Sequence, residues 1–136
     1  MEEYKKPLPL IDDEDMKPFW EAAKLHELLA RRCECCGTFY PPVVSCPNCT
    51  GAETKWGKVS GKAKLFTYVV MHQLYHPGFK DDIPYNVSVV ELDEGPLLVS
   101  NVVECKNEDL KIGMPLEVVF DDVTTEVTIP RFRPTS

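Results

Sequence analysis

Two C-x-x-C pairs constrain this chain more than any other feature of its sequence. Cys33 and Cys36 form one pair within "RRCECCGTFYPPVVSCPNCTG", Cys46 and Cys49 form the other, and residues 37–45 separate them. A C-x-x-C turn directs two thiolates at one ion, and two such turns supply the four sulfur ligands of a closed, tetrahedral site. The spacing therefore predicts a small zinc ribbon that holds one structural Zn²⁺ per chain.

Other uses of these thiols explain the pattern less well. Disulfides are rare in a reducing cytoplasm, and a redox pair of the thioredoxin type accounts for only one of the two C-x-x-C pairs. Four thiolates also bind iron, so the ligands alone leave zinc and iron open. Cys35 offers an alternative ligand in "CECC". Because only Cys33 and Cys36 have the required spacing, we expect Cys35 to be a free thiol beside the site.

The composition is that of an acidic globular protein. The chain has 136 residues, 43% of them hydrophobic and 27% charged, which is enough apolar material for a packed core. No apolar run approaches the roughly 18 residues of a membrane span, and the first residues lack the apolar segment of a secretory signal. We therefore expect a cytoplasmic protein without a membrane anchor. The net charge of -7 disfavours nucleic acid as a partner without excluding it.

The sequence divides into an arm, a metal-binding module and a β domain. Residues 1–17 are polar and are interpreted as an extended arm. Residues 18–52 contain the ribbon and begin with "PFWEAAKLHELLA", whose apolar spacing predicts an amphipathic helix. We expect this helix to have Asp15 as its N-cap and to end near Leu28. Residues 53–134 contain the β-rich segments.

The β domain contains three pairs of strand-forming runs. "TKWGKVSGKAKLFTYVVMHQL" has two runs around an SG turn, "YNVSVVELDEGPLLVSNVVEC" has two around DEGP, and "LEVVFDDVTTEVTIPRF" supplies the last pair. Five or six strands without a long helix predict a small Greek-key barrel, for which an OB-fold is the simplest choice. The predicted fold class is therefore mainly β, with an N-terminal helix, a zinc ribbon and a five- to six-stranded OB-fold barrel.

The sequence shows no self-sufficient catalytic constellation. Nucleophile elbows, phosphate loops and dinucleotide fingerprints are absent from it. His72 and His76 lie near acidic residues in "MHQLYHPGFKDD", which we interpret as a polar loop and not as a catalytic pair. Cys105 lies far from the other cysteines and is interpreted as a small packed residue.

Aromatic and basic residues in the β domain instead favour a contact surface. Tyr75, Phe79 and Tyr85 occur in or beside the same loop, as expected of residues that bind a partner or ligand. Arg131 and Arg133 flank an aromatic residue in "IPRFRP". Arginines in such a pattern bind phosphates or carboxylates, and a simple surface ion pair explains them equally well.

The order of these features resembles the proteins of domain of unknown function 35 (DUF35), which join an N-terminal helix and a rubredoxin-like zinc ribbon to an OB-fold. The resemblance extends from about residue 17 to residue 134. It rests on "PFWEAAKLHELLARRCECCGTFYPPVVSCPNCTG", "GKVSGKAKLFTYVVMH", "IPYNVSVVELDEGPLLVSNVVE", "LKIGMPLEVVFDD" and "IPRFRP". Similar proteins accompany hydratases or enzymes of thiolase fold that act on acyl-CoA thioesters.

The resemblance therefore implies an accessory subunit that is not catalytic alone. Its partner would be a thiolase-fold large subunit that carries the catalytic cysteine, for example of the benzylsuccinyl-CoA thiolase type, with acyl-CoA at the shared interface. Lys62 and Lys64 are further candidates for CoA phosphates on charge alone. A nucleic-acid module with a basic groove and an independent enzyme are the two alternatives. The expected contacts to the partner or to CoA are Tyr40, His72, Tyr75, Phe79, Tyr85, Arg131 and Arg133.

Overall fold

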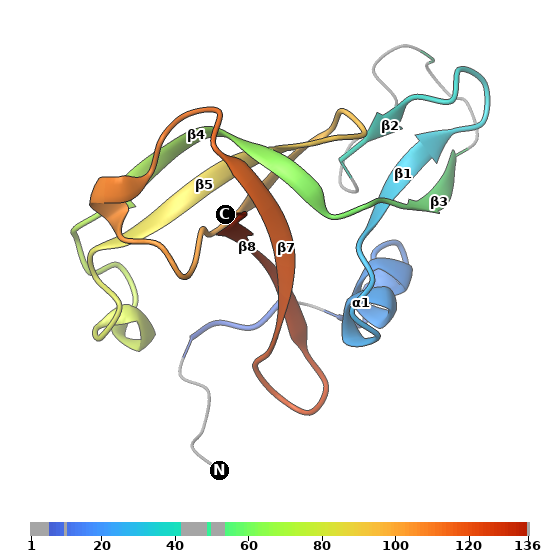
Figure 1. Cartoon of the computed structure of the whole chain (residues 1–136). Helices are drawn as coiled ribbons and strands as arrows, with labels where there is room; N and C mark the ends of the chain where they lie inside the picture. The colour runs from blue at the N-terminus through green and yellow to red at the C-terminus, as the bar shows by residue number, and fades with distance from the viewer. Residues whose placement is uncertain (1–5, 10, 42–48, 50–53, 136) are drawn as a thin grey trace.

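A computed structural model describes residues 6–9, 11–41, 49 and 54–135 (Figure 1). The described residues form one α-helix and two antiparallel sheets, which confirms the predicted mainly β fold. Among these residues, no helix is long and apolar enough to cross a bilayer. The elements are α1 (Lys17–Lys24), β1 (Leu29–Cys33), β2 (Phe39–Tyr40), β3 (Thr54–Lys58), β4 (Lys62–Met71), η1 (Pro77–Phe79), β5 (Tyr85–Leu92), β6 (Leu97–Ser100), η2 (Asn107–Asp109), β7 (Pro115–Asp122) and β8 (Thr128–Pro134).

Helix α1 is shorter than the sequence predicted, because it ends at Lys24 and not near Leu28. His26 has a φ of 61°, and its left-handed backbone reverses the chain. The N–H of Glu27 donates to the carbonyl of Ala22 at 2.9 Å, which is the long hydrogen bond of a Schellman C-cap. Glycine is the usual residue at this position, so a histidine there gave no signal in the sequence.

The start of α1 also differs from the prediction. Met16 is the N-cap and makes no side-chain capping bond. The carboxylate of Asp15, the predicted N-cap, instead accepts a 2.7 Å hydrogen bond from Nη2 of Arg31 in β1. A long-range ion pair therefore takes the place of the local cap.

The first sheet has the strand order β2-β1-β3 and carries the predicted ribbon. Strand β1 pairs antiparallel with both neighbours, so that Arg31 lies opposite Tyr40 on one side and Trp56 on the other. The guanidinium carbon of Arg31 also lies 4.4 Å from the centroid of the Trp56 ring. Strand β3 lies within residues 53–134, the range expected for the barrel, but its hydrogen-bonded partner is β1 of the ribbon.

The second sheet has the order β6-β5-β4-β7-β8 and curls toward closure (Figure 1). The hairpins predicted around DEGP and in the last strand pair are confirmed as β5–β6 and β7–β8. An isolated parallel bridge joins Val102, beyond the end of β6, to Phe132 of β8. The N–H of Val103 donates to the carbonyl of Phe132 at 2.7 Å. These contacts bring the two ends of the sheet together, as expected for an OB-fold.

The turn between the two sheets requires glycine. Gly61 has a φ of 83°, and its carbonyl accepts a 2.8 Å hydrogen bond from the N–H of Val118 in β7. A β-carbon at this position would collide with the Val118 side chain. The predicted SG turn therefore fixes the approach of the ribbon to the barrel.

One continuous core joins α1 and the base of β1 to the curled sheet. Phe132 and Val90 are fully buried at its centre, and Phe19 of α1 contributes from outside the barrel. The helix is therefore packed on the barrel and is not an independent unit. The buried members of this core are Phe19, Leu28, Ala30, Val59, Ala63, Leu65, Val90, Leu92, Val102, Leu110, Leu116 and Phe132.

Candidate metal centre

The first cysteine pair lies on a tight turn between β1 and β2. Cys33 ends β1, and the N–H of Gly37 donates to its carbonyl at 2.9 Å. The N–H of Cys33 donates in turn to the carbonyl of Thr38 at 3.0 Å. Gly37 has a φ of 73°, a conformation that glycine adopts without steric cost. This turn places Cys36 opposite Cys33, as the spacing requires.

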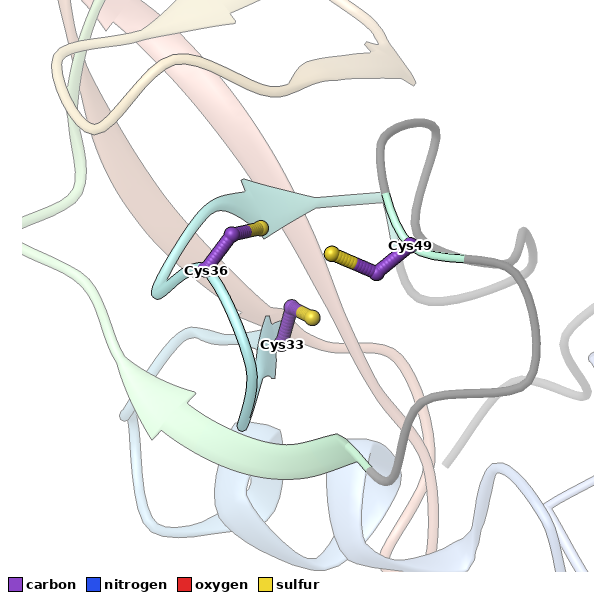
Figure 2. Close-up of side chains that lie close together, drawn as sticks. All are labelled: Cys33, Cys36 and Cys49. Atoms are coloured by element: carbon purple, nitrogen blue, oxygen red, sulfur yellow. The ribbon is translucent and has the colours of Figure 1, made fainter.

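Three cysteine sulfurs converge beside this turn. The Sγ atoms of Cys33, Cys36 and Cys49 all lie within 4.8 Å of one another and point toward a common centre (Figure 2). Cys33 is buried, Cys36 is exposed and Cys49 is intermediate. The fourth predicted ligand, Cys46, lies outside the described residues.

The electrostatics of this three-sulfur group fit a cation. Hydrogen bonding to Cys36 raises the pKa of the Cys49 thiol, and hydrogen bonding to Cys35 and burial raise that pKa further. Crowded thiols ionise together only when a positive charge compensates them, and a bound metal deprotonates its thiol ligands. Cys35 is exposed and lies beside the group. Sulfur donors at this spacing suit zinc and other thiophilic ions.

Tyr40 is part of the ribbon interior and not a surface contact, which corrects the sequence-based expectation. Its side chain is 2% exposed and packs in one small cluster with Cys33 and Cys49. Its hydroxyl has no hydrogen-bond partner among the described residues. The alternation along β2 turns Tyr40 inward, where it packs beside the sulfurs.

Two of the predicted aromatic contacts form one wall of a cleft at the end of the barrel. The rings of Phe79 and Tyr85 stack with their centroids 4.8 Å apart. The cleft has a volume of about 730 Å³ and also contacts Lys6 and Pro7 of the N-terminal arm. Lys6 pairs with Asp82 at 2.6 Å across this region. The arm therefore covers part of the cleft.

The other predicted contacts in this loop differ in their surroundings. Tyr75 is 67% exposed, and His72 is exposed as well. His76 has a structural role, because its Nδ1 accepts a 2.9 Å hydrogen bond from the N–H of Gly78 and caps η1. His76 is therefore held by the local backbone, whereas His72 lies at the surface.

The two predicted arginines are already matched by acidic partners. Nε of Arg131 donates to Asp121 at 2.8 Å, and Nε of Arg133 donates to Glu117 at 2.9 Å. Arg133 also lies 3.5 Å from Glu104. The hydrogen bond and the charge of Glu117 raise the pKa of Arg133 above its ordinary value. The basic spot in the sequence is thus largely neutralised by internal ion pairs.

Sequence reasoning missed a buried polar clamp at the point where the barrel closes. Asn86 is 5% exposed, and its amide donates to the carbonyl of Val102 and accepts from the N–H of Val102, both at 2.8 Å. Ser88 donates to the same side chain at 2.6 Å. An asparagine within the valine-rich run "YNVSVV" was the available signal. The Asn86 amide forms hydrogen bonds with the N–H and the carbonyl of Val102, which the isolated β-bridge leaves without backbone partners.

Two regions of the chain match known families. Residues 20–55 match the family described as "ChsH2, rubredoxin-like zinc ribbon domain", and residues 56–121 match "ChsH2, C-terminal OB-fold domain". A DUF35 domain-containing scaffold protein from Methanocaldococcus jannaschii is 41% identical over 95 residues, which are 68% of this chain and 67% of that protein. The chain belongs to the DUF35 family. The resemblance that the sequence indicated is thereby confirmed.

Two further relatives of this DUF35 chain carry enzyme names. A probable enoyl-CoA hydratase alpha subunit from Thermomonospora curvata is 37% identical over 131 residues. These residues are 95% of this chain but 40% of that protein, so the DUF35 chain spans less than half of this relative. A solved structure of the Ltp2-ChsH2(DUF35) aldolase superposes with a TM-score of 0.80 at 35% identity, covering 93% of this chain and 98% of that chain.

Proposed function

We propose that this DUF35 protein is an accessory subunit that completes an enzyme acting on acyl-CoA thioesters. The observation that carries the proposal is the match to nearly the whole of one chain in the Ltp2-ChsH2(DUF35) aldolase structure. The scaffold and hydratase alpha subunit names of the other relatives support the same role. In these proteins the DUF35 unit occurs both as a separate chain and as part of a longer one.

The side chains of the described region support a role without catalysis. Three of the thiols lie in the metal centre. Burial raises the pKa of the Cys105 thiol and the charge of Asp109 raises it further, which makes this thiol a poor nucleophile. His26 is bound to Asp122, and His76 caps a turn. We place the catalytic groups on the partner.

The finer features of the proposal concern the partner and the metal. The partner is a thiolase-fold large subunit that carries the catalytic cysteine, and acyl-CoA lies at or near the shared interface. Zn²⁺ bound by Cys33, Cys36, Cys46 and Cys49 stabilises the ribbon, because four thiolates form a closed structural site. With the ion bound, the chemistry that it supplies is folding energy and not catalysis.

The proposal is tested by purifying the tagged chain from its native cell extract and identifying the proteins that co-elute in one stoichiometric peak. The expected result is a large subunit whose acyl-CoA turnover rises when the chain is added back. Turnover by the isolated DUF35 chain would contradict the accessory role. A chain that elutes alone, or with a partner inactive on acyl-CoA thioesters, would also contradict the proposal.

A further inference from the structure

The middle of the outward face of β4, β5 and β6 is apolar, although antiparallel sheets usually present polar residues to solvent. The exposed Lys64 of β4 and Glu91 of β5, which lie opposite each other, bound this part of the face. Asn86 and Ser88 of β5 point into the barrel and are buried, so the residues that alternate with them point outward. The register places Val87 opposite Val69 of β4, and Val89 opposite Val99 of β6. We call these four residues, Val69, Val87, Val89 and Val99, the outer valine face.

This face is open to solvent in the described chain. Val99 is 68% exposed and Val69 is 56% exposed. Thr67 of β4 lies opposite Val89 and completes the row without adding charge. Edge strands are normally protected by charged residues, but β6 has the uncharged sequence LLVS. The exposed valines beside this uncharged edge strand leave the middle of the face open to packing by another chain.

Further exposed apolar residues lie near the face. Phe66, in the bulge of β4, is 50% exposed. Ile112 is 63% exposed and precedes Gly113, whose N–H donates to the carbonyl of Leu65 at 2.7 Å. Beyond the end of β4, Tyr75 is 67% exposed in the following loop.

The position of the face within the barrel indicates binding. Strands β5 and β6 are the second and third strands of the curled sheet, and residues 72–84 connect the first to the second. In OB-folds this pair of strands and this loop form the usual ligand surface. Nucleic acids require stacking aromatics and basic residues there. The four valines at the centre of this face provide neither, so the centre of the face suits a protein partner.

We propose that the outer valine face, extended by Phe66, is the surface that docks the large subunit. The inference rests on the proposed function and names the interface that it leaves open. The partner surface that fits is an uncharged apolar patch with a basic rim, which complements the net charge of -7 of this chain.

Charge favours a different protein over a second copy of the chain. Strands lie about 4.8 Å apart and rise about 3.3 Å per residue, so three strands of four to five residues cover roughly 200–250 Å². A stable interface buries about 800 Å² on each partner, so any partner of this face must also cover neighbouring surface. Two copies, each of net charge -7, also repel one another. A larger subunit reaches the required area by extending over Ile112 and the loop after β4.

The test uses the complex reconstituted from the full chain and the large subunit that co-purifies with it. Val99→Lys and Val69→Lys each place a charge on the face, and Leu25→Lys is the matched control. Leu25 is 76% exposed and lies at the C-cap of α1, away from the face. Calorimetry should show binding weakened about tenfold or more by either valine variant and unchanged by Leu25→Lys. Equal affinities for the wild-type chain and both valine variants would overturn the inference.

A second measurement does not depend on variants. Amide exchange in the wild-type complex should slow in residues 66–71, 85–91 and 97–100 relative to the free chain. Slowing confined to other segments would overturn the proposed face. A wild-type dimer that Val99→Lys converts to monomers would assign the face to a second copy. Binding of an oligo(dT) probe that Val99→Glu abolishes would assign it to nucleic acid.

The outcomes also separate this inference from the proposed function. If the wild-type chain and Val99→Lys bind the large subunit equally well, the result contradicts the proposed docking face but not the accessory role. If a large partner docks on this face but has no activity on acyl-CoA thioesters, the result contradicts the proposed function but not the docking face.

Discussion

The tip of the ribbon and the curled sheet are held together by different forces. Among the described residues around the sulfurs, the buried cluster consists of Cys33 and Tyr40, with Cys49 packed against it. The barrel core contains twelve buried residues, including the fully buried Phe132. Apolar burial stabilises a fold roughly in proportion to the area removed from water. The barrel therefore has a sufficient core of its own, and we expect the tip to depend on metal ligation.

The boundary between the part of the chain held by the hydrophobic core and the part held by the metal does not coincide with the boundary between the two sheets. Phe19, Leu28 and Ala30 belong to the helix and the base of the ribbon, yet they pack in the barrel core. Cys33, three residues beyond Ala30 on the same strand, belongs to the small cluster. We infer that metal loss disorders the chain from Cys33 outward and leaves α1 on the barrel.

The largest effect is expected from Cys33→Ser. A serine hydroxyl is a poor substitute for a thiolate, and structural zinc contributes roughly 10–16 kcal/mol to small zinc-finger modules. Bound metal, measured by elemental analysis, should fall from one ion per chain to almost none. In amide NMR spectra, signals from β2 and the cysteine turn should collapse, while signals from β4, β5 and α1 remain.

Cys35→Ser is the matched control for this prediction. Cys35 is exposed beside the three-sulfur group, and it should be replaceable without loss of metal. Loss of the ion from Cys35→Ser together with retention by Cys33→Ser would show that the ligand set is wrong. Loss of the barrel signals on metal removal would show that the two regions are not separable.

Phe132→Ala should produce the next largest effect, and it should act on the other region. Phe132 is completely buried and lies on β8 where the barrel closes. Truncation of a buried phenylalanine typically costs about 3–5 kcal/mol. Urea unfolding should show a loss of this size in the barrel transition. Ile112→Ala is the control, since Ile112 is 63% exposed, and an equal loss in both variants would contradict the role of the closure.

Asn86→Ala should have an intermediate effect, because it removes polar contacts and not apolar area. The alanine leaves both the N–H and the carbonyl of Val102 without the Asn86 amide. A buried backbone group without a partner costs about 1–3 kcal/mol. Asn107→Ala is the matched control, because it removes a hydrogen bond from a side-chain amide to the carbonyl of Pro84 at an exposed position. Equal unfolding free energies for the two variants would contradict the clamp.

The sequence predicted those features that depend on local spacing. The ribbon followed from Cys33 and Cys36 with the second cysteine pair, and the hairpins followed from glycine-bearing turns between β-forming runs. The features that it missed depend on distant partners. His26 ends α1 in a left-handed conformation while its ring stacks on Phe120, with centroids 5.1 Å apart. No local pattern around His26 or Asn86 reveals the distant groups that they contact.

The surface contact between the residues that follow α1 and the curled sheet should have the smallest effect and a distinct pH dependence. Nε2 of His26 lies 3.1 Å from Asp122 at the end of β7, and Thr128 of β8 donates to the same carboxylate. The hydrogen bond from Thr128 is the main cause that lowers the pKa of Asp122, followed by the hydrogen bond to His26. The pair is largely solvent-exposed, so Asp122→Asn should lower the melting temperature by no more than a few degrees at neutral pH.

The sign of the pH dependence follows from the lowered pKa of Asp122. The contribution of Asp122 to the free energy of unfolding is fully present above about pH 3.9, which is the pKa of an unfolded aspartate. This contribution is lost as the pH falls through the lower pKa of the folded state. The difference in melting temperature between the wild-type chain and Asp122→Asn should therefore close in acid. Comparison at each pH cancels metal release, which affects both chains. Thr128→Val should raise the pKa of the Asp122 carboxyl in an NMR titration, because it removes the main donor. A difference that persists unchanged into acid would show that Asp122 acts there through its shape and not through its charge.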